Sequence, residues 1–449
     1  MRDLILLAVL PFLIFAIFQR PFIGLGLWIW TALFYPNGWV YGAASNIRYN
    51  LLFTGITIAV YFTSKHKVRL VLGATGTLLL MFFFWVSMST IFGLAPAEYR
   101  WELWTRFAKI IALFIFILLI VEKKLHIDFF LWCLIFSVGF YAGLEGLKYI
   151  LSGGGHKIEG MAGHVLGDRN ELSIAMAMLL PICFYLMGEF GNESKLLKIA
   201  FLGLISLLVI AIIGTHSRGG LVALIAVGTY LFIKSKRKLL FLILLVCAGS
   251  AFLGIIPKEW FERMNTIGQA SGDASFMGRV VAWKLSFILA VQNPLFGGGF
   301  KALEYQPVWA NLVQDFYRYS FFYTGDNIPP IVPRAAHSIY FQVLGDHGFI
   351  GLFLFCSTLL SAFMRAGKIA RICIAKNGPE WIKKLATMLR LSIFTYAVGG
   401  AALSFSYFDM IYALIGLVIV LDYRFLMPLI LQQQANDTPQ FSHVKNEHE

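Results

Sequence analysis

The sequence predicts an all-α protein that crosses a membrane many times. Of its 449 residues, 59% are hydrophobic and only 14% are charged, whereas soluble proteins carry about 25% charged residues. Apolar runs follow one another along nearly the whole chain, separated mostly by short polar loops. A hydrocarbon core about 30 Å thick requires roughly 20 apolar residues per helix, so most of these runs are suitable spans. We expect about twelve transmembrane helices.

The apolar runs differ in length along the chain. The first two, 4–18 and 21–34, are short, and a polar turn at 35–49 separates them from the run 51–63. Counting all three as spans gives thirteen helices in total; we expect twelve, with the first two runs folded as an imperfect hairpin. The later runs are 70–92, 105–121, 127–149, 171–188, 197–213, 219–233, 239–256, 338–364, 388–405 and 408–422.

This pattern divides the chain into four parts. Transmembrane helices occupy 1–256 and 337–425, and a loop over 257–336 lies between them. Loops of that length are usually functional, and this one contains an amphipathic helical stretch at 278–291. The polar tail, 426–449, is expected to be cytoplasmic and to be disordered after Leu431.

The net charge of +13 is distributed unevenly between the loops. The positive excess lies in alternate short loops, whereas the loops between them, including 257–336, are close to neutral. Basic loops stay in the cytoplasm, so this asymmetry predicts an inner-membrane protein whose long loop faces the side away from the cytoplasm. Because topology accounts for the basicity, nucleic acid is not an expected partner.

The sequence contains no pattern typical of a metal site or of a disulfide framework. Four of the five cysteines lie in apolar runs and Cys373 lies in a basic loop, with no Cys-x-x-Cys spacing. On the predicted outer side, Asp168 and Glu171 are the nearest approach to a magnesium-binding pair, and Arg169 lies between them. We therefore expect neither a metal nor a cofactor.

Several charged side chains are predicted at the outer mouths of helices or in the long loop, where they are candidates for function. Converging arginines suit a phosphate or diphosphate, because the guanidinium fork pairs with oxyanions. His337, at the entrance of a helix, is the natural base near neutral pH. The alternatives are contacts with lipid headgroups for the arginines and helix capping for His337. The four candidate arginines are Arg169, Arg218, Arg279 and Arg334.

Other conspicuous residues favour structural roles. His164, His216 and His347 are expected to be structural, not catalytic. The aromatic cluster 316–323 is more typical of an interfacial belt than of a surface on which sugars stack.

The order of several short motifs resembles the O-antigen ligase and polymerase superfamily. These motifs are a Ser-Arg-Gly turn at 217–219, Arg279 with Trp283, a Pro-x-x-Gly-x-Gly loop at 294–299, and His337-Ser-x-Tyr followed by a Gly-x-x-Gly at 348–351. The N-terminal half, including 167–172, is similar to the branch of O-glycosylation ligases associated with exosortase systems. Ser338 departs from the asparagine that is common in the superfamily, and Arg169 departs from an asparagine that is frequent in the branch.

The resemblance implies a metal-independent glycosyltransferase of the GT-C type. Such an enzyme would transfer a glycan from undecaprenyl diphosphate to a lipid A–core oligosaccharide and invert the anomeric centre. It implies His337 as the general base and Arg218 and Arg279 as diphosphate ligands, with Arg169 and Arg334 as further candidates. Three alternatives remain: an O-antigen polymerase, a protein O-oligosaccharyltransferase and, as a different class, a lipid-glycan transporter.

Overall fold

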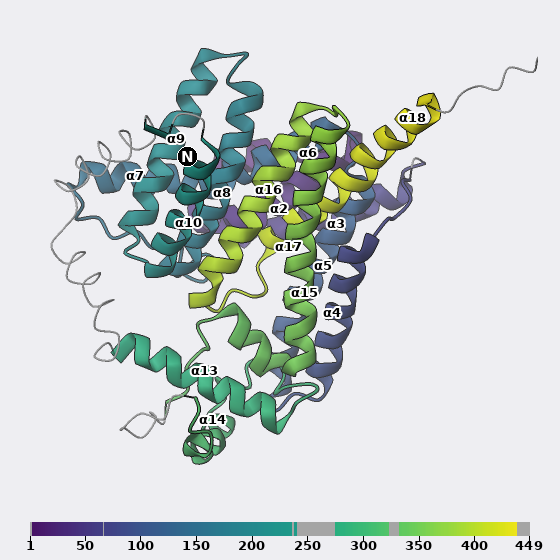
Figure 1. Ribbon diagram of the computed structural model, residues 1–449. Helices are drawn as coiled ribbons and strands as arrows, with labels where there is room; N and C mark the ends of the chain where they lie inside the picture. The colour runs from purple at the N-terminus through teal and green to yellow at the C-terminus, as the bar shows by residue number, and fades with distance from the viewer. Residues whose placement is uncertain (1, 66, 236–237, 240–273, 323–331, 438–449) are drawn as a thin grey trace, which may run out of the picture.

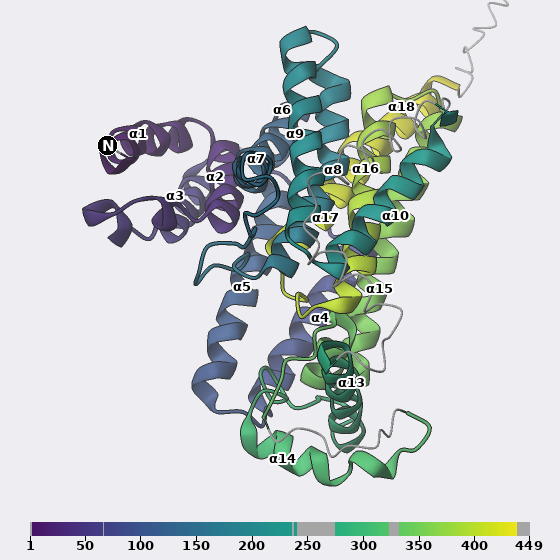
Figure 2. The ribbon, with the colours of Figure 1, turned by 90° about the vertical axis from the view of Figure 1, so that its left-hand side faces the viewer.

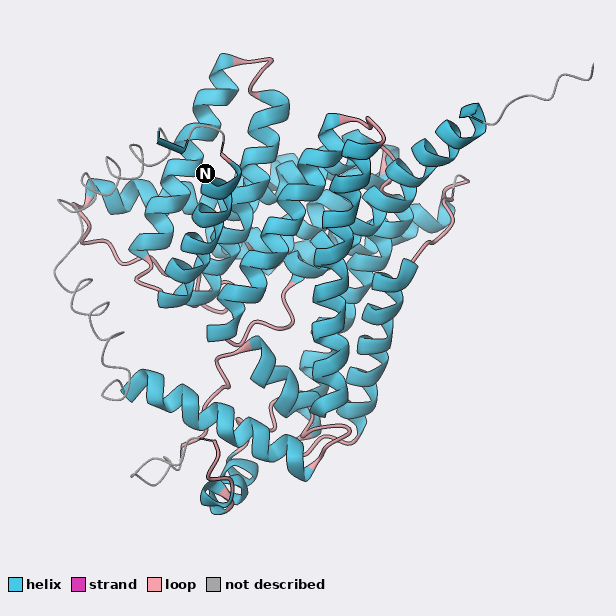
Figure 3. Cartoon of the chain, viewed as in Figure 1, coloured by secondary structure: helices cyan, strands magenta, loops and turns pink. Residues whose placement is uncertain are grey.

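The computed structural model describes residues 2–65, 67–235, 238–239, 274–322 and 332–437 (Figure 1). Within these residues the protein consists of helices, turns and loops, with no strand (Figure 3). The helices are α1 (Arg2–Gln19), α2 (Pro21–Phe34), α3 (Tyr49–Thr63), α4 (Gly73–Ile91), α5 (Ala97–Ile120), α6 (Lys124–Leu134), α7 (Phe140–Leu151), α8 (Arg169–Phe190), α9 (Lys195–Gly214), α10 (Arg218–Lys234), α13 (Ala274–Gln292), α14 (Gln306–Gln314), α15 (Ile339–Ala375), α16 (Glu380–Gly399), α17 (Asp409–Val420) and α18 (Met427–Asp437).

Nine helical segments in the described part of the chain are long and apolar enough to cross a membrane. Two of them contain π-helical turns, η3 (Ile135–Gly139) between α6 and α7 and η7 (Leu421–Leu426) between α17 and α18. The prediction of a polytopic all-α membrane protein is therefore confirmed. The predicted run 239–256 lies outside the described residues, so twelve spans remains a prediction.

The first three helices lie at one side of the bundle (Figure 2). The helix α2 links them to the rest of the protein, since it packs against α3 and α6 as well as against α1. The outward side of α1 is strongly apolar, with Phe12 73% exposed and Phe15 63% exposed, as expected for a helix surrounded by lipid. The turn predicted at 35–49 forms the short 3-10 helices η1 (Pro36–Trp39) and η2 (Gly42–Asn46).

The long loop carries two of the helices, α13 and α14, which lie beyond one end of the bundle (Figure 1). We call this end the outer end and the opposite one the inner end. The helix α13 covers the stretch 278–291 and packs against α15. Trp309 and Phe316, which follow in the chain, are fully buried with Leu285 in a separate small core. This core holds the loop as a compact layer over the outer end.

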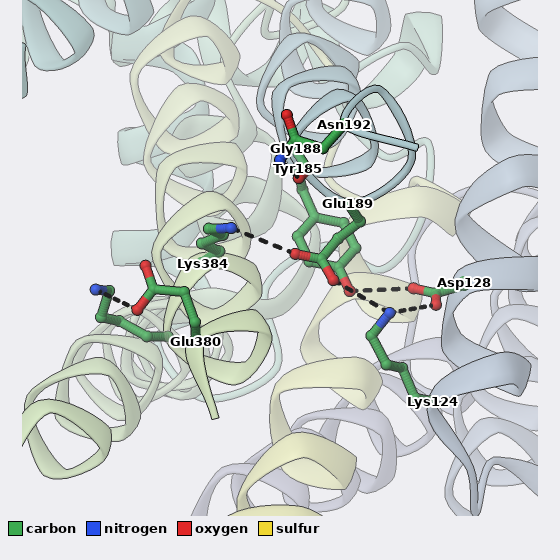
Figure 4. A network of polar contacts seen from close by, with 9 residues as sticks. Lys124, Asp128, Tyr185, Gly188, Glu189, Asn192, Glu380 and Lys384 are labelled. Atoms are coloured by element: carbon green, nitrogen blue, oxygen red, sulfur yellow. Dashed lines mark hydrogen bonds and ion pairs between the residues drawn. The ribbon is translucent and has the colours of Figure 1, made fainter. Parts of the chain in front are cut away.

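Polar contacts link three helices near the inner end (Figure 4). Lys124 of α6 pairs with Asp128 at 2.9 Å and with Glu189 of α8 at 3.2 Å. Glu189 also pairs with Lys384 of α16 at 3.6 Å, and Tyr185 donates to Asp128. Because these ion pairs join three of the predicted cytoplasmic loops or their flanking turns, those loops lie at the same end of the bundle.

The helix α15 is broken at Gly348, where φ is 70° and ψ is −170°. In an unbroken helix, the Gly345 carbonyl would accept a hydrogen bond from the amide of Phe349. Here it accepts instead from the amide of Gly298 at 2.8 Å, and the Phe349 amide donates to the Pro294 carbonyl at 3.1 Å. The loop 294–299 therefore satisfies the backbone groups that the break releases, as a buried break in a membrane helix requires.

Side chains of α4 and the segment after α16 complete this junction. Ser89 donates to the Phe296 and Asp346 carbonyls at 2.6 and 2.8 Å, and its oxygen lies 2.8 Å from Nδ1 of the buried His347. The other ring nitrogen of His347 lies 2.8 Å from the Tyr407 hydroxyl. Four separate segments of the chain thus meet at one buried position.

Close backbone contact explains why glycines occur in both sequences that meet here. A Cβ atom on Gly348 would lie 2.5 Å from the Leu295 carbonyl oxygen, and one on Gly297 would lie 2.5 Å from the Gly348 nitrogen. Both residues also have positive φ, which disfavours any side chain. The Pro-x-x-Gly-x-Gly and Gly-x-x-Gly motifs are therefore two halves of one contact.

The final helix departs from the sequence prediction. We expected disorder after Leu431, but α18 continues to Asp437. Helical hydrogen bonds therefore extend into the polar part of the tail, because Gln and Ala are good helix formers and need no apolar partner.

The junction predicts that Gly348→Ala destabilises the protein by about 2 kcal/mol or more, from unfavourable φ together with the clash. Thermal unfolding of the purified protein in detergent would measure the loss. Gly203→Ala is the matched control, because a Cβ atom there meets nothing within 4 Å. Equal melting temperatures for the two variants would contradict this account of the junction.

Candidate functional site

A cavity of about 400 Å³ lies at the outer end of the bundle, between the membrane helices and the layer formed by the long loop. Its walls come from α5, the start of α8, α13, the loop after α13, the first turns of α15 and the segment after α16. The polar and charged residues lining it are Arg106, His164, Asp168, Asn170, Glu171, Ser286, Lys301, Glu304, His337, Gln342, Asp346, Ser404, Ser406 and Tyr407.

His337 lines this cavity directly before α15 begins. Its φ is +47°, an uncommon conformation for a non-glycine residue that costs about 1–3 kcal/mol. The backbone amide of His337 donates to the Ser404 hydroxyl at 2.8 Å, which helps to hold this conformation. Ser338, not His337, occupies the N-cap position, and its side chain makes no capping hydrogen bond.

The electrostatic surroundings favour a neutral His337. Water reaches the side chain, yet partial desolvation by the surrounding protein lowers its pKa below the ordinary 6.5, and the positive charge of Arg279 lowers it further. Asp168 and Glu304 oppose this shift. The imidazole is therefore mostly unprotonated near pH 7, the form that accepts a proton.

Two of the predicted arginines lie near His337. Arg279 and Arg334 both lower the pKa of the imidazole through their charge. Arg334 also packs on the residue before Arg279, since a Cβ atom on Gly278 would lie 2.2 Å from an Arg334 guanidinium nitrogen. Positive charge is thus concentrated on one side of the histidine.

The other two predicted arginines begin helices. Arg218 is the first residue of α10, and Arg169 is the first residue of α8. Ser217 and Asp168 cap these helices, accepting from the amides of Gly220 and Asn170 respectively. Ser217 also donates to the Asn170 side chain at 2.8 Å, which links the two helix starts. Among the described residues that line the cavity, none of the four arginines appears, although Asn170 does.

The cavity contains charged residues that the sequence prediction missed. Arg106 lies well inside α5, more than two turns after its first residue. Lys301, with φ of +63°, follows the glycine-rich loop and pairs with Glu304 at 2.6 Å. Arg106 could have been predicted from the sequence, because a cation inside a predicted membrane helix is a candidate for function. No sequence pattern distinguished Lys301 and Glu304 from ordinary loop residues.

The other histidines have structural contacts. His347 is fully buried at the junction with Ser89 and Tyr407. His164 lines the cavity, but its ring stacks on Tyr35 and a ring nitrogen contacts the Ala32 carbonyl at 2.9 Å. Their contacts account for both residues without a catalytic role.

In the described part of the aromatic cluster 316–323, most side chains pack against other aromatic rings. Phe316 is buried beneath α13, and Tyr319, Phe321 and Phe322 surround the ring of Phe287. Phe321 nevertheless remains 78% exposed. The end of the cluster, at 323, lies outside the described residues.

The combination of a neutral base and concentrated positive charge suits a reaction in which a hydroxyl loses a proton while an anionic group departs. Comparison with known protein families supports the same kind of reaction. Residues 201–356, which include Arg218, Arg279, the loop 294–299 and His337, match the O-antigen ligase family.

This match over residues 201–356 supports the O-antigen ligase superfamily as the group that the chain resembles. Residues 1–190 match a family of unknown function, DUF5935. No curated protein matches the chain. The O-antigen ligase family match implies ligase activity of the glycosyltransferase kind in general terms. The matched region supplies His337 and both glycine motifs of the α15 junction.

The reactivity of His337 provides a test that needs no substrate. Carbethoxylation by diethyl pyrocarbonate requires the neutral imidazole, so its pH dependence, followed by mass spectrometry, reports the pKa of His337. We expect a pKa below 6.5. Glu304→Gln should lower the pKa further, because the carboxylate stabilises the imidazolium. Glu193→Gln, which removes a charge at the inner end, should leave the pKa unchanged; an upward shift with Glu304→Gln would contradict the assignment.

Proposed function

We propose that the protein is an O-antigen ligase that transfers a glycan from undecaprenyl diphosphate to a hydroxyl of the lipid A–core oligosaccharide. It would act in the bacterial inner membrane, with the cavity open to the periplasm. The observation that carries the proposal is that His337 lines a cavity at one end of a membrane bundle, with Arg279 and Arg334 near enough for their charges to lower its pKa. Such a position is accessible both to a lipid-linked donor and to a water-exposed acceptor.

In the proposed reaction, the acceptor hydroxyl gives its proton to His337 as its oxygen attacks the anomeric carbon. The bond from that carbon to the diphosphate oxygen breaks, and the electron pair leaves with undecaprenyl diphosphate. Arg218, Arg279, Arg334 and Arg169 would stabilise the negative charge that develops on the leaving group. A single displacement inverts the anomeric centre, and no metal or cofactor is required.

A reconstituted assay tests the choice of acceptor. The purified protein in liposomes is given an undecaprenyl diphosphate glycan together with lipid A–core, a serine-containing peptide, or a second lipid-linked glycan. We expect product only with lipid A–core. Transfer to the peptide would indicate a protein O-oligosaccharyltransferase, and elongation of the lipid-linked glycan would indicate a polymerase. Movement of the glycan across the bilayer without any transfer would favour a transporter.

His337→Ala and His337→Gln should each reduce transfer by about 10²–10⁴-fold. Glutamine retains a hydrogen bond but cannot accept a proton, so it separates catalysis from capping. His156→Gln is the control, because His156 pairs with Glu145 outside the cavity. Donor binding and melting temperature should be unchanged in both His337 variants. Near wild-type turnover in His337→Gln would remove this residue from the mechanism.

Arg279→Ala should lower transfer by about 10²–10³-fold, the range expected for loss of one group that stabilises a developing anion. Arg279→Lys should recover only part of it, since an ammonium group cannot pair bidentately. Arg318→Ala, in the same outer layer but 67% exposed, should retain activity. Transfer should also persist in EDTA; loss in EDTA with rescue by Mg²⁺ would contradict charge stabilisation by arginine alone.

A further inference from the structure

A second cavity, of about 460 Å³, lies towards the inner end of the bundle. It is enclosed by the start of α4, the second half of α15 and the junction of α17 with η7. The α15 side of this cavity changes character along the helix. Leu360 and Met364 lie nearer the membrane centre and are 58% and 61% exposed, whereas Lys368 and Arg371 follow towards the helix end.

These four residues lie on one face of α15, because they are spaced three or four positions apart. One end of the cavity wall is therefore apolar and the other is cationic. A soluble anion would use only the cationic end, and a neutral hydrocarbon only the apolar end. An anionic lipid uses both.

The charges that line the cavity do not cancel. Asp422 is the one acidic residue among its described lining residues, and its side chain is only 2% exposed because Arg365 pairs with it. In the described part of the chain, Lys368 and Arg371 have no hydrogen-bond or ion-pair partner through their side chains, and both are exposed. Two positive charges are thus left at the cationic end.

The start of α4 adds positive potential at the same place. Residues 73–75 line the cavity, and Leu72 at the N-cap provides no side-chain hydrogen bond to the first amides. The N-terminal end of a helix favours anions, most strongly when basic side chains surround it. Gly73 has φ of +56°, and the Tyr423 ring lies 2.5 Å from where its Cβ atom would be, so this wall is closely packed.

We propose that this inner cavity binds an anionic lipid, with the lipid phosphate between Lys368, Arg371 and the start of α4, and the hydrocarbon chain along Leu360 and Met364. Basic pockets between membrane helices are known to suit acidic headgroups. The site is separate from the His337 cavity, and it requires neither the proposed donor nor the proposed acceptor. Anionic phospholipids and polyprenyl phosphates share this chemistry.

Native mass spectrometry of the full-length protein, titrated separately with phosphatidylglycerol, undecaprenyl phosphate, phosphatidylcholine and inorganic phosphate, tests the proposal. We expect at least one of the two anionic lipids to bind, and the stronger binder identifies the source of the phosphate. The Lys368→Gln/Arg371→Gln double variant should bind that lipid on the order of tenfold more weakly. Lys195→Gln/Lys198→Gln, which removes the same charge from exposed positions at the inner end, should bind it normally.

The Arg279→Ala variant should also retain this binding, which distinguishes the inner cavity from the proposed diphosphate site. Both double variants change only exposed side chains, so both should fold. Melting temperatures equal to that of the wild-type protein in lipid-free detergent would verify this. The lipid should raise the melting temperature of the wild-type protein but not that of the Lys368→Gln/Arg371→Gln variant. Equal binding of phosphatidylcholine, binding of inorganic phosphate alone, or unchanged affinity in the double variant would each overturn the proposal.

Discussion

The exchange of backbone hydrogen bonds between α15 and the loop 294–299 is the constraint on which the outer end depends. Gly348 is buried, so the amides and carbonyls released by the break have no water to replace the lost hydrogen bonds. The break at Gly348 is stable only while the amide of Gly298 and the carbonyl of Pro294 occupy the vacated positions. The long loop is thereby attached to the bundle through its backbone, not merely through side chains.

The position of the cavity follows from this attachment. Gly345 and Asp346, whose carbonyls accept from the loop, also line the cavity. Lys301 and Glu304 come directly after the loop, and His337 lies directly before the helix that is broken. A change at Gly348 would therefore displace Lys301 and Glu304 relative to His337. Gly297 and Gly348 thus help to shape the site although neither is among the described residues that line the cavity.

The two cavities differ in how their charges are arranged. In the outer cavity, opposite charges act on His337, since Arg279 and Arg334 lower its pKa whereas Asp168 and Glu304 raise it. In the inner cavity, Arg365 is paired with Asp422, and Lys368 and Arg371 lie at one end of a wall whose other end carries Leu360 and Met364. The first arrangement suits proton transfer, and the second suits retention of an anion.

The amino-acid sequence by itself determined the fold class and the identity of the main motifs. Apolar runs require helices in a membrane, and these runs predicted that α4 to α10 and α15 to α17 exist. Some bounds differ, since α5 and α16 begin eight residues earlier than predicted and α15 ends eleven residues later. The sequence also predicted that His337 lies at the entrance of a helix, because a polar residue between a long polar loop and an apolar run marks a helix boundary. The sequence did not predict that α18 continues to Asp437, because polar composition alone does not decide between coil and helix.

Only the tertiary structure decided which charged groups surround His337 and why two distant glycine motifs occur together. Arg106, Lys301 and Glu304 reach the cavity from segments far apart in the chain, and their distances depend on how α5, α13 and α15 pack. The contact between Gly297 and Gly348 likewise leaves no periodic signal, because it joins backbone to backbone across the fold. Hydropathy reports how each segment meets lipid, whereas neighbours across the bundle depend on shape and hydrogen bonding between segments.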